Sequence, residues 1–550
     1  MKDNHWIKRV ADQVERNVDK KKGPEAEIIC ASGISPSGVI HLGNLREIIT
    51  VHLVQEELLR RGRKAVHLHF WDDYDRFRKV PANVPASFEQ YIGMPLSQIP
   101  DPFGEHGSYA EHFMEEFKGS LEKMGINPTY IRQSEVYRNG TYNELIKESL
   151  VKRFQIFDVL SQYQTEEQQK NREAQRPKYY PFKVYCESCG KDNTEMTGYD
   201  ADTSLISYTC KTCGHAGAYR LDEKVQGKLV WKVDWPMRWK HYQVDFEPGG
   251  LDHSTPGSSY TVGKQIVKEV FGVENPFYAG YAFVGITGGS QKISSSAGTD
   301  ATPENALSIL EPAMLRWLYI RADIKSTFNI NFDDQVFRIY DEWDRLKLRV
   351  AEGKANDLEA FIFDACTRLH SGVVASSSFA IPFRLLAATY EITQGNYDEI
   401  YRILHHHIEG LPSKEELLPQ IQLRLQCAAG WVQKFIPDEE RIVVRQQFDS
   451  EAFASFDPLI REGIGLLVTE YEASWTLDGL TSLMYSIPKR QKNFPPDSKP
   501  TDEIKQLQHA FFIALYRLIL GKETGPRLPT LFLSVGKERL KQLLTPGVAV

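Results

Sequence analysis

The chain has 550 residues, 41% of them hydrophobic and 25% charged, and a formal net charge of −7. Since a single hydrophobic core stops growing at about 250 to 300 residues, we expect three or four folded domains rather than general disorder. The acidic balance argues against non-specific DNA binding, so a contact with nucleic acid would have to come from local basic patches.

No segment has the length and composition of a membrane span. The longest apolar stretch, residues 510–520, is about half a span and contains Arg517, which predicts a buried helix. The first 22 residues are densely charged and lack the apolar run and small-residue cleavage site of a secretory signal. We therefore expect a cytoplasmic protein without a membrane partner.

The N-terminal part predicts an α/β fold. Residues 28–31 form a short apolar run that ends in Ser, Gly and Pro, and apolar residues then recur at helical spacing over 45–53. A second strand is expected over 65–70. This βαβ unit predicts a parallel sheet and makes residues 1–80 the first half of a Rossmann-like domain.

The middle of the chain interrupts and then completes this domain. Residues 81–225 contain many prolines and two cysteine pairs, and they are interpreted as an insertion. The sheet is expected to resume near 228–233, and a further apolar strand at 277–286 ends in Gly288-Gly289. Residues 226–304 are thus predicted to be the second half of the α/β domain.

Helical patterns dominate the rest. Residues 305–370 are predicted to form a helical connecting region and 371–550 an all-α region. Within the latter, one apolar helix face is formed by Ile504, Leu507, Phe511, Leu515 and Leu518. The expected fold class is a multi-domain protein with an α/β Rossmann-like domain, an insertion and an all-α C-terminal region.

The loop from Ala31 to Asn44 joins the first strand to its helix. Its glycines allow close backbone approach to phosphates, and the helix N-terminus supplies N–H donors, so the geometry favours an anion site. The loop lacks P-loop spacing. A simple tight turn is the alternative interpretation.

Two motifs carry a resemblance to class I aminoacyl-tRNA synthetases. His41-Leu-Gly-Asn44 resembles the HIGH signature, with Asn44 where many members have His, and Lys292-Ile-Ser-Ser-Ser296 resembles KMSKS, with Ser295 in place of the second lysine. Alone, the second motif is also compatible with a polar surface loop. The resemblance implies that ATP is bound by Pro36, Ser37, Gly38, His41, Gly43, Asn44, Lys292, Ile293, Ser294, Ser295 and Ser296, with catalytic roles for His41, Asn44, Lys292 and Ser295.

Cysteine spacing predicts a metal site. Cys186-x-x-Cys189 and Cys210-x-x-Cys213, each followed by Gly, have the spacing of a closed four-thiolate zinc site, although unligated cysteines are an alternative. The family resemblance suggests a second zinc in a subtler cluster, for which an ordinary polar surface is the alternative. Its candidate ligands are Asp101, Glu105, His106 and His112.

Two further runs are candidate pocket walls for an amino acid. Phe70-Trp-Asp-Asp73 ends the second strand, where related enzymes hold the substrate α-amino group, and a tryptophan-rich run from Trp231 to Trp239 precedes Gly249-Gly250-Leu-Asp-His253. Aromatic side chains and carboxylates suit the methylenes and ε-ammonium of lysine, although tryptophan-rich segments also build cores. The predicted lysine site consists of Gly33, Ser35, Asp72, Asp73, Trp231, Asp234, Trp235 and His253.

Over nearly the whole chain these features resemble class I lysyl-tRNA synthetases. The resemblance implies ATP-dependent ligation of lysine to tRNA(Lys) through a lysyl-adenylate, with Mg²⁺ and Zn²⁺ as metals and with the 371–550 region on the anticodon. The alternatives are a glutamyl or glutaminyl specificity, a small-molecule nucleotidyltransferase, and a zinc-bearing RNA-binding paralogue without catalysis. Such nucleotidyltransferases are short and have no use for a long helical tail, whereas His41 and Lys292 argue against loss of catalysis.

Overall fold

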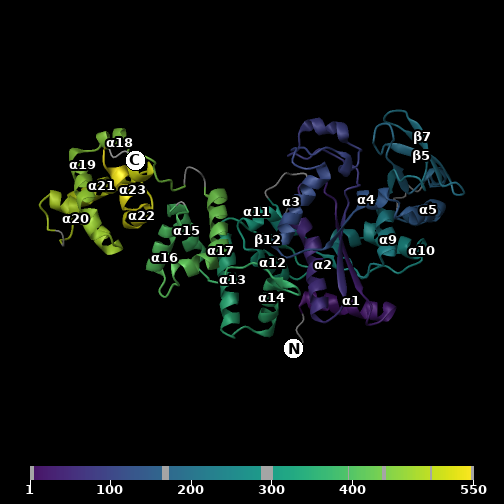
Figure 1. Cartoon of the computed structure of the whole chain (residues 1–550), viewed down its shortest axis with the longest axis horizontal. Helices are drawn as coiled ribbons and strands as arrows, with labels where there is room; N and C mark the ends of the chain where they lie inside the picture. Colours follow the sequence, from purple (N-terminus) through teal and green to yellow (C-terminus); the bar gives the residue numbers. More distant parts are fainter. Residues whose placement is uncertain are drawn as a thin grey trace. The chain divides into compact units, whose positions relative to one another are not determined.

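The computed structural model describes residues 5–163, 172–286, 301–393, 395–436, 441–495 and 498–546. The chain divides into two compact units, which are described separately (Figure 1). Unit 1 comprises residues 1–331 and 345–376, and unit 2 comprises residues 332–344 and 377–550.

Unit 1 is built around a parallel sheet. Strands β1 (Ile28–Ile34), β2 (Ala65–Trp71) and β3 (Thr129–Arg132) lie in the order β1-β2-β3, and Ile34 pairs with Trp71 at the carboxyl ends of the first two. Parallel bridges from Cys30 to Phe246 and from Phe246 to Phe277 extend the sheet beyond β1. The predicted βαβ unit is confirmed, whereas β3 was not predicted and lies inside the stretch interpreted as an insertion.

The prediction that the sheet resumes at residues 228–233 is wrong. Strand β8 (Gly227–Leu229) pairs antiparallel with β4 (Phe182–Val184), away from the parallel sheet, and Trp231–Tyr242 form helix α9. A short, almost continuously apolar run does not distinguish a strand from a buried helix by periodicity. The strand predicted at 277–286 is divided into β10 (Gly280–Tyr281) and β11 (Val284–Ile286), which pair parallel with β9 (Gly249–Gly250) and β12 (Phe328–Ile330).

Helices cover both faces of the parallel sheet (Figure 1). Helix α2 (Leu42–Arg60) packs on β1 and β2, and α1 (Trp6–Lys22) packs on α2. The apolar side chains that predicted α2 are 0–2% exposed: Leu45, Ile48, Ile49 and Leu53. On the other face, α9 and α10 (Ser259–Glu269) share a core with Ala31 and Phe70. These layers place the β1–α2 loop at the carboxyl edge of the sheet, where open α/β folds bind ligands.

The segment between β2 and α9 contains short helices and a small antiparallel sheet. The sheet has the order β5-β6-β7 and carries one cysteine pair at its β6–β7 end. The elements of this segment besides β3, β4 and β8 are η1 (Ala86–Tyr91), η2 (Leu96–Gln98), α3 (Tyr109–Lys123), α4 (Gln133–Arg138), α5 (Asn143–Val151), α6 (Arg153–Ser161), α8 (Arg172–Gln175), η3 (Arg176–Lys178), β5 (Thr194–Asp200), β6 (Leu205–Cys210) and β7 (Ala216–Arg220).

The remaining elements of unit 1 are mostly helical. They are η4 (Leu251–Ser254), α11 (Pro303–Leu307), α12 (Pro312–Arg321), α14 (Asp357–Thr367), β13 (Arg368–Leu369) and β14 (Gly372–Val373). Helix α13 (Gln335–Ala351) contributes its first part to unit 2 and its last part to unit 1.

The described residues of unit 2 form helices and no strand. Besides part of α13 they are α15 (Phe383–Thr393), α16 (Tyr397–His407), α17 (Lys414–Phe435), α18 (Ser450–Ser455), α19 (Pro458–Glu470), η5 (Tyr471–Ser474), α20 (Leu477–Gln491), α21 (Asp502–Leu520), α22 (Leu528–Val535) and α23 (Lys537–Leu544). The apolar run at 510–520 lies in α21, as predicted, and its Phe511, Leu515 and Leu518 are buried. Among the helices that the structure describes, none is long and apolar enough to cross a membrane.

Candidate active site and metal centre

The β1–α2 loop is closed by reciprocal hydrogen bonds at the start of α2. The backbone N–H of Asn44 donates to His41 Nδ1 at 3.3 Å, and the backbone N–H of His41 donates to Asn44 Oδ1 at 3.2 Å. Since Nδ1 accepts a hydrogen bond, the neutral ring carries its proton on Nε2, where it is a donor. Asn44, the departure from the HIGH pattern, therefore has a defined role as the second half of a capping box.

Gly43 is needed for this arrangement. A Cβ at position 43 would lie 2.9 Å from both Cε1 and Nδ1 of the His41 ring. A larger residue would therefore push the imidazole out of its position at the N-terminus of α2.

A cavity of about 150 Å³, here called the helix-end cavity, opens beside this N-terminus. The N–H groups and the positive end of the helix dipole favour a negative ligand there. The cavity is lined by His41, Gly43, Asn44, Gly250, Asp252, His253, Tyr281, Phe283 and Val284. Three of these residues, Asn44, His253 and Tyr281, also line the neighbouring cavity, so ligands in the two cavities would meet.

The neighbouring cavity, the tryptophan cavity, has a volume of about 290 Å³. Trp231 and Trp235 stack with ring centroids 5.2 Å apart, and His253 meets Trp235 edge-on at 5.9 Å. The predicted lysine-site residues that the structure brings together on its wall are Gly33, Ser35, Trp231, Trp235 and His253. Aromatic faces of this kind suit the methylenes of a long aliphatic amine.

The three aspartates predicted for the lysine site do not line the tryptophan cavity. Asp73 is 0% exposed and accepts hydrogen bonds from Arg132 Nε at 3.0 Å and from the backbone N–H of Ser134 at 2.8 Å. Together with a bond from the Ser134 hydroxyl, they engage both carboxylate oxygens and tie the end of β2 to the β3–α4 junction. The geometry therefore gives no support to the prediction that Asp73 holds the substrate amino group.

Asp72 and Asp234 are also committed to internal partners. Both accept hydrogen bonds from Arg238, and Lys228 Nζ lies 3.1 Å from Asp72 and 3.7 Å from Asp234. Burial opposes ionisation, but the Arg238 guanidinium and the Lys228 ammonium together lower the pKa of Asp72. These aspartates hold two buried cations instead of facing a ligand.

Two glutamates that the sequence analysis missed do line the tryptophan cavity. Glu47 accepts a hydrogen bond from Tyr281 Oη at 2.6 Å, and Glu247 accepts one from Trp239 Nε1 at 2.6 Å. Burial raises the pKa of Glu47 to about 8 and that of Glu247 to about 7. Carboxyl groups of this kind attract a cationic ligand, because an ammonium nearby restores their charged form.

Glu47 could have been found from the pattern. It follows Asn44 by three positions in α2, so both residues lie on the helix face that begins at the signature loop. Glu247 directly precedes Pro248-Gly249-Gly250, and the glycine pair is the sequence signal beside it.

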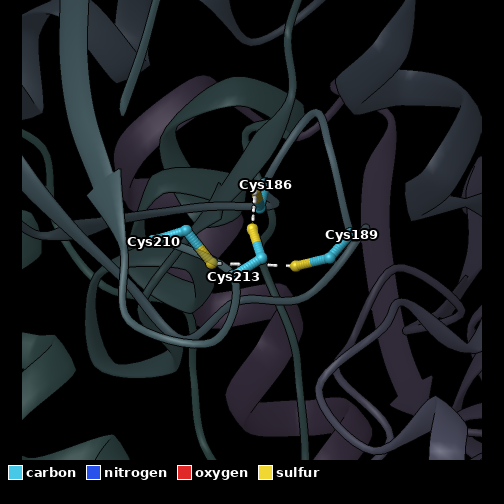
Figure 2. Close-up of side chains that lie close together, drawn as sticks. All are labelled: Cys186, Cys189, Cys210 and Cys213. Atoms are coloured by element: carbon cyan, nitrogen blue, oxygen red, sulfur yellow. Dashed lines mark hydrogen bonds between the residues drawn. The ribbon is translucent and has the colours of Figure 1, made fainter. Parts of the chain in front are cut away.

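The four cysteines of the predicted zinc site lie together (Figure 2). Cys186 Sγ lies 3.7 Å from Cys213 Sγ, and Cys189 Sγ lies 3.7 Å from Cys210 Sγ. Four thiolates arranged tetrahedrally at about 2.3 Å from a zinc ion would be about 3.8 Å apart, so the observed spacing fits a tetrahedral zinc ion.

The two cysteine pairs have matching local geometry. Gly190 and Gly214 adopt φ values of +73° and +75°, and their backbone N–H groups donate to the carbonyls of Cys186 and Cys210. The left-handed conformation explains the glycine after each pair. Zinc in this closed shell would have a structural role, since no coordination position is left for a substrate.

Replacing Cys186 by serine is expected to reduce the zinc content from about one equivalent to nearly none and to lower the melting temperature, because Cys186 is a buried ligand. Elemental analysis and thermal unfolding of the same samples would check both effects. Cys366→Ser, at a buried cysteine outside the cluster, is the control and should retain the metal. Wild-type protein purified without chelator but free of zinc would contradict the assignment.

The second predicted cluster is partly assembled. Asp101, His106 and His112 offer ligand atoms within 4.8 Å of one another. Within the described part of the chain, buried His112 Nδ1 has no hydrogen-bond partner, and Asp101 Oδ1 lies 3.4 Å from it. Glu105 Oε2 lies 3.8 Å from His112 Nδ1, but its side chain is 67% exposed. Asp101 also accepts backbone N–H groups of residues 103, 105 and 106, an arrangement that a loop can adopt without metal.

If this cluster binds a second zinc, His112→Ala should remove about one equivalent while the four-cysteine site keeps its own. The physical reason to expect a ligand is that buried His112 Nδ1 makes no hydrogen bond among the described residues and lies 3.4 Å from Asp101 Oδ1. His509→Ala, at an exposed histidine of α21, is the control and should leave the metal content unchanged. A total of one equivalent in the wild-type protein would contradict the second site.

Lys292, Ile293, Ser294, Ser295 and Ser296 lie outside the described residues, so the second signature stays a sequence prediction. Pro36 and Gly38 are buried in the β1–α2 loop, and Ser37 lines the tryptophan cavity.

Comparison with known proteins gives a family. The sequence model described as "tRNA synthetases class I (K)" matches residues 4–365. The chain is 42% identical to the lysine–tRNA ligase of Streptomyces coelicolor over 98% of both chains, and 34% identical to that of Pyrococcus furiosus over 97% of this chain and 98% of the relative. A solved glutamate tRNA ligase from Elizabethkingia meningosepticum covers 94% of this chain and 98% of its own, at 12% identity and a TM-score of 0.39, too low to establish a common arrangement. The matched family model and the extent of both alignments show that this chain belongs to the class I (K) tRNA synthetases.

Proposed function

We propose that this protein ligates L-lysine to tRNA(Lys) at the expense of ATP, through a lysyl-adenylate. One observation carries the proposal: the tryptophan cavity and the helix-end cavity share Asn44, His253 and Tyr281 at the carboxyl edge of the sheet. An amino acid in the first cavity would thus present its carboxylate to a nucleotide phosphate in the second.

The wall of the tryptophan cavity favours lysine. Trp231 and Trp235 would flank the methylenes, and Glu47, oriented by Tyr281, would accept the ε-ammonium. Glu247 would add negative charge on the same wall. The relatives at 42% and 34% identity are lysine–tRNA ligases, in agreement with this specificity.

A glutamyl or glutaminyl specificity is not favoured. Such a substrate needs a cation or an amide partner, and Arg238 does line the cavity. Its guanidinium is, however, bound by Asp72 and Asp234, which together with Asp75 give the buried cluster three carboxylates for two cations. The surroundings therefore disfavour a further negative charge, such as the side-chain carboxylate of a glutamate substrate.

In the first step the lysine carboxylate attacks the α-phosphate of ATP, which forms lysyl-adenylate and releases pyrophosphate. His41 Nε2–H and the N-terminal N–H groups of α2 would stabilise the charge that develops on the phosphate. Lys292 would supply a cation, with Ser295 as a hydrogen-bond donor where the signature has a second lysine. Mg²⁺ would neutralise the triphosphate when bound.

In the second step the 3′-terminal ribose hydroxyl of tRNA attacks the carbonyl of the adenylate, and AMP leaves. No covalent enzyme intermediate is needed, because positioning and charge stabilisation supply the catalysis. We assign residues 226–304 to the second half of the catalytic domain, 305–370 to contact with the tRNA stem and 371–550 to the anticodon.

Amino-acid-dependent ATP–pyrophosphate exchange, run with each of the twenty amino acids in the presence and absence of tRNA, tests the first step. We expect exchange with lysine alone. Exchange with glutamate or glutamine would refute the lysine assignment, and no exchange with any amino acid under either condition would favour a non-catalytic RNA-binding role.

A further inference from the structure

A third cavity, of about 350 Å³, adjoins the tryptophan cavity through Ser35 and Ser37, which line both. Its remaining wall comes from the segment that follows β2: Asp75, Arg76, Arg78, Lys79 and Pro81. This basic cavity thus brings three cationic side chains close to the site proposed for lysyl-adenylate, and the reaction described above gives them no role.

The first part of the segment that carries these cations is anchored by backbone hydrogen bonds. Residues 73–77 pair with residues 93–97 through backbone hydrogen bonds, among them Phe77 N to Met94 O at 2.7 Å and Leu96 N to Asp75 O at 2.9 Å. Phe77 is 0% exposed and packs on Tyr109 with ring centroids 5.0 Å apart. Tyr109 Oη in turn donates to the carbonyl of Ser37 at 3.0 Å, so the basic segment and the β1–α2 loop are held in a fixed relation.

The side chains of Arg76 and Arg78, on either side of buried Phe77, point towards solvent. Side chains alternate along an extended segment, so burial of Phe77 turns Arg76 and Arg78 outward, and both are exposed. Arg76 lies 3.3 Å from Asp192, next to the first cysteine pair. Among the residues that the structure describes, the side chains of Arg78 and Lys79 form no ion pair or hydrogen bond.

Asp75, the carboxylate in the wall of the basic cavity, is paired with Lys228. Asp75 Oδ1 lies 2.5 Å from Lys228 Nζ, a cation that it shares with Asp72 and Asp234. Even with Asp75 counted as a full negative charge, Arg76, Arg78 and Lys79 give the wall a net positive charge beside the reacting centre, which favours a phosphate-bearing ligand.

We propose that Arg76, Arg78 and Lys79 bind the phosphodiester groups at the single-stranded 3′ end of the tRNA and so position its terminal ribose beside the adenylate. This inference rests on the proposed function. Pyrophosphate shares the phosphate chemistry, but the cavity lies on the β2 side of the β1–α2 loop, whereas the helix-end cavity lies at the N-terminus of α2. The 3′ end therefore fits the basic cavity better than the leaving pyrophosphate does.

The test is a binding comparison between two RNAs and two forms of the full chain. One RNA is an acceptor-stem duplex with its unpaired 3′-CCA, and the other lacks these three nucleotides. We expect Arg78→Gln/Lys79→Gln to weaken binding of the first RNA about 10- to 100-fold and to leave the second unchanged. The slope of log affinity against log salt should fall by about 0.7 for each phosphate group that the variant no longer neutralises.

The matched control is Lys20→Gln/Lys64→Gln, which removes the same charge from two exposed side chains, one in the last turn of α1 and one directly before β2. Both variants should keep the wild-type melting temperature and affinity for a non-hydrolysable lysyl-adenylate analogue. Arg78→Lys should retain more affinity for the CCA-bearing RNA than Arg78→Gln.

Equal affinity of wild type and variant for the CCA-bearing RNA would overturn the proposal, as would equal weakening for both RNAs. A variant altered only in its affinity for pyrophosphate would also overturn it. These failures are distinct from failure of the proposed function, because the latter would appear as missing lysine-dependent exchange in the wild-type protein.

Discussion

Replacing His41 with alanine is expected to lower the rate constant for lysyl-adenylate formation about 10²- to 10³-fold. The affinities for lysine and ATP should change much less, because the Nε2–H donor acts on charge that develops at the α-phosphate. Lys292→Ala should have a similar effect, at the upper end of the range because Ser295 provides no second cation. Single-turnover measurement of adenylate formation would report the rate constant directly.

His41→Asn separates catalysis from folding. Asparagine is a good N-cap residue, so this variant keeps an acceptor for the N-terminus of α2 but loses the imidazole donor. It should fold like the wild-type protein, and its rate constant for adenylate formation should be nearly as low as that of His41→Ala. A wild-type rate in His41→Asn would show that His41 serves only to cap the helix.

Replacing Glu47 with glutamine is expected to weaken lysine binding about 100-fold, because an ammonium in the tryptophan cavity would lose its charged partner. The wild-type affinity should depend on pH. With the pKa of Glu47 raised to about 8, the free carboxyl group is mostly protonated at neutral pH and must lose its proton when the ammonium binds. Lysine binding should therefore weaken about tenfold for each pH unit below 7 and strengthen as the pH rises towards 8.

Calorimetry in buffers of different ionisation enthalpy would measure this linkage. We expect release of about one proton per lysine at pH 7 in the wild-type protein, and much less in Glu47→Gln. Glu27→Gln, at an exposed position just before β1, makes the same side-chain replacement away from the cavity and should behave like the wild type. An unchanged lysine affinity in Glu47→Gln would exclude Glu47 as the ammonium partner.

Local sequence patterns predicted the parts of the structure that local physics determines. The spacing of apolar residues over 45–53 predicted α2, and the glycine after each C-x-x-C pair follows from the left-handed turn that closes it. The β1–α2 loop was located because a strand, a glycine-rich turn and a helix are consecutive in the chain.

The wrong predictions concern features of the structure that long-range packing determines. The run after Val230 forms a helix because Val233, Trp235, Met237 and Trp239 are buried around it, and no local signal separates this from a strand. Asp72 and Asp234 were predicted to bind the ammonium group of a substrate. In the structure they bind cations, but these are Arg238 and Lys228 of the same chain. The bonds from Asp72 to Arg238 and Lys228 join residues far apart in sequence and cannot be found from spacing, whereas Asp234 and Arg238 are four residues apart in α9 and would have been paired had the run been read as a helix.

The most direct test of the account is to identify what the protein joins. The purified chain would be incubated with ATP, all twenty amino acids and a total tRNA pool, and the aminoacyl-tRNA would be analysed for both its amino acid and its tRNA. We expect lysine esterified to tRNA(Lys) and no other pairing. Another amino acid on the tRNA, or no aminoacyl-tRNA at all, would contradict the central claim.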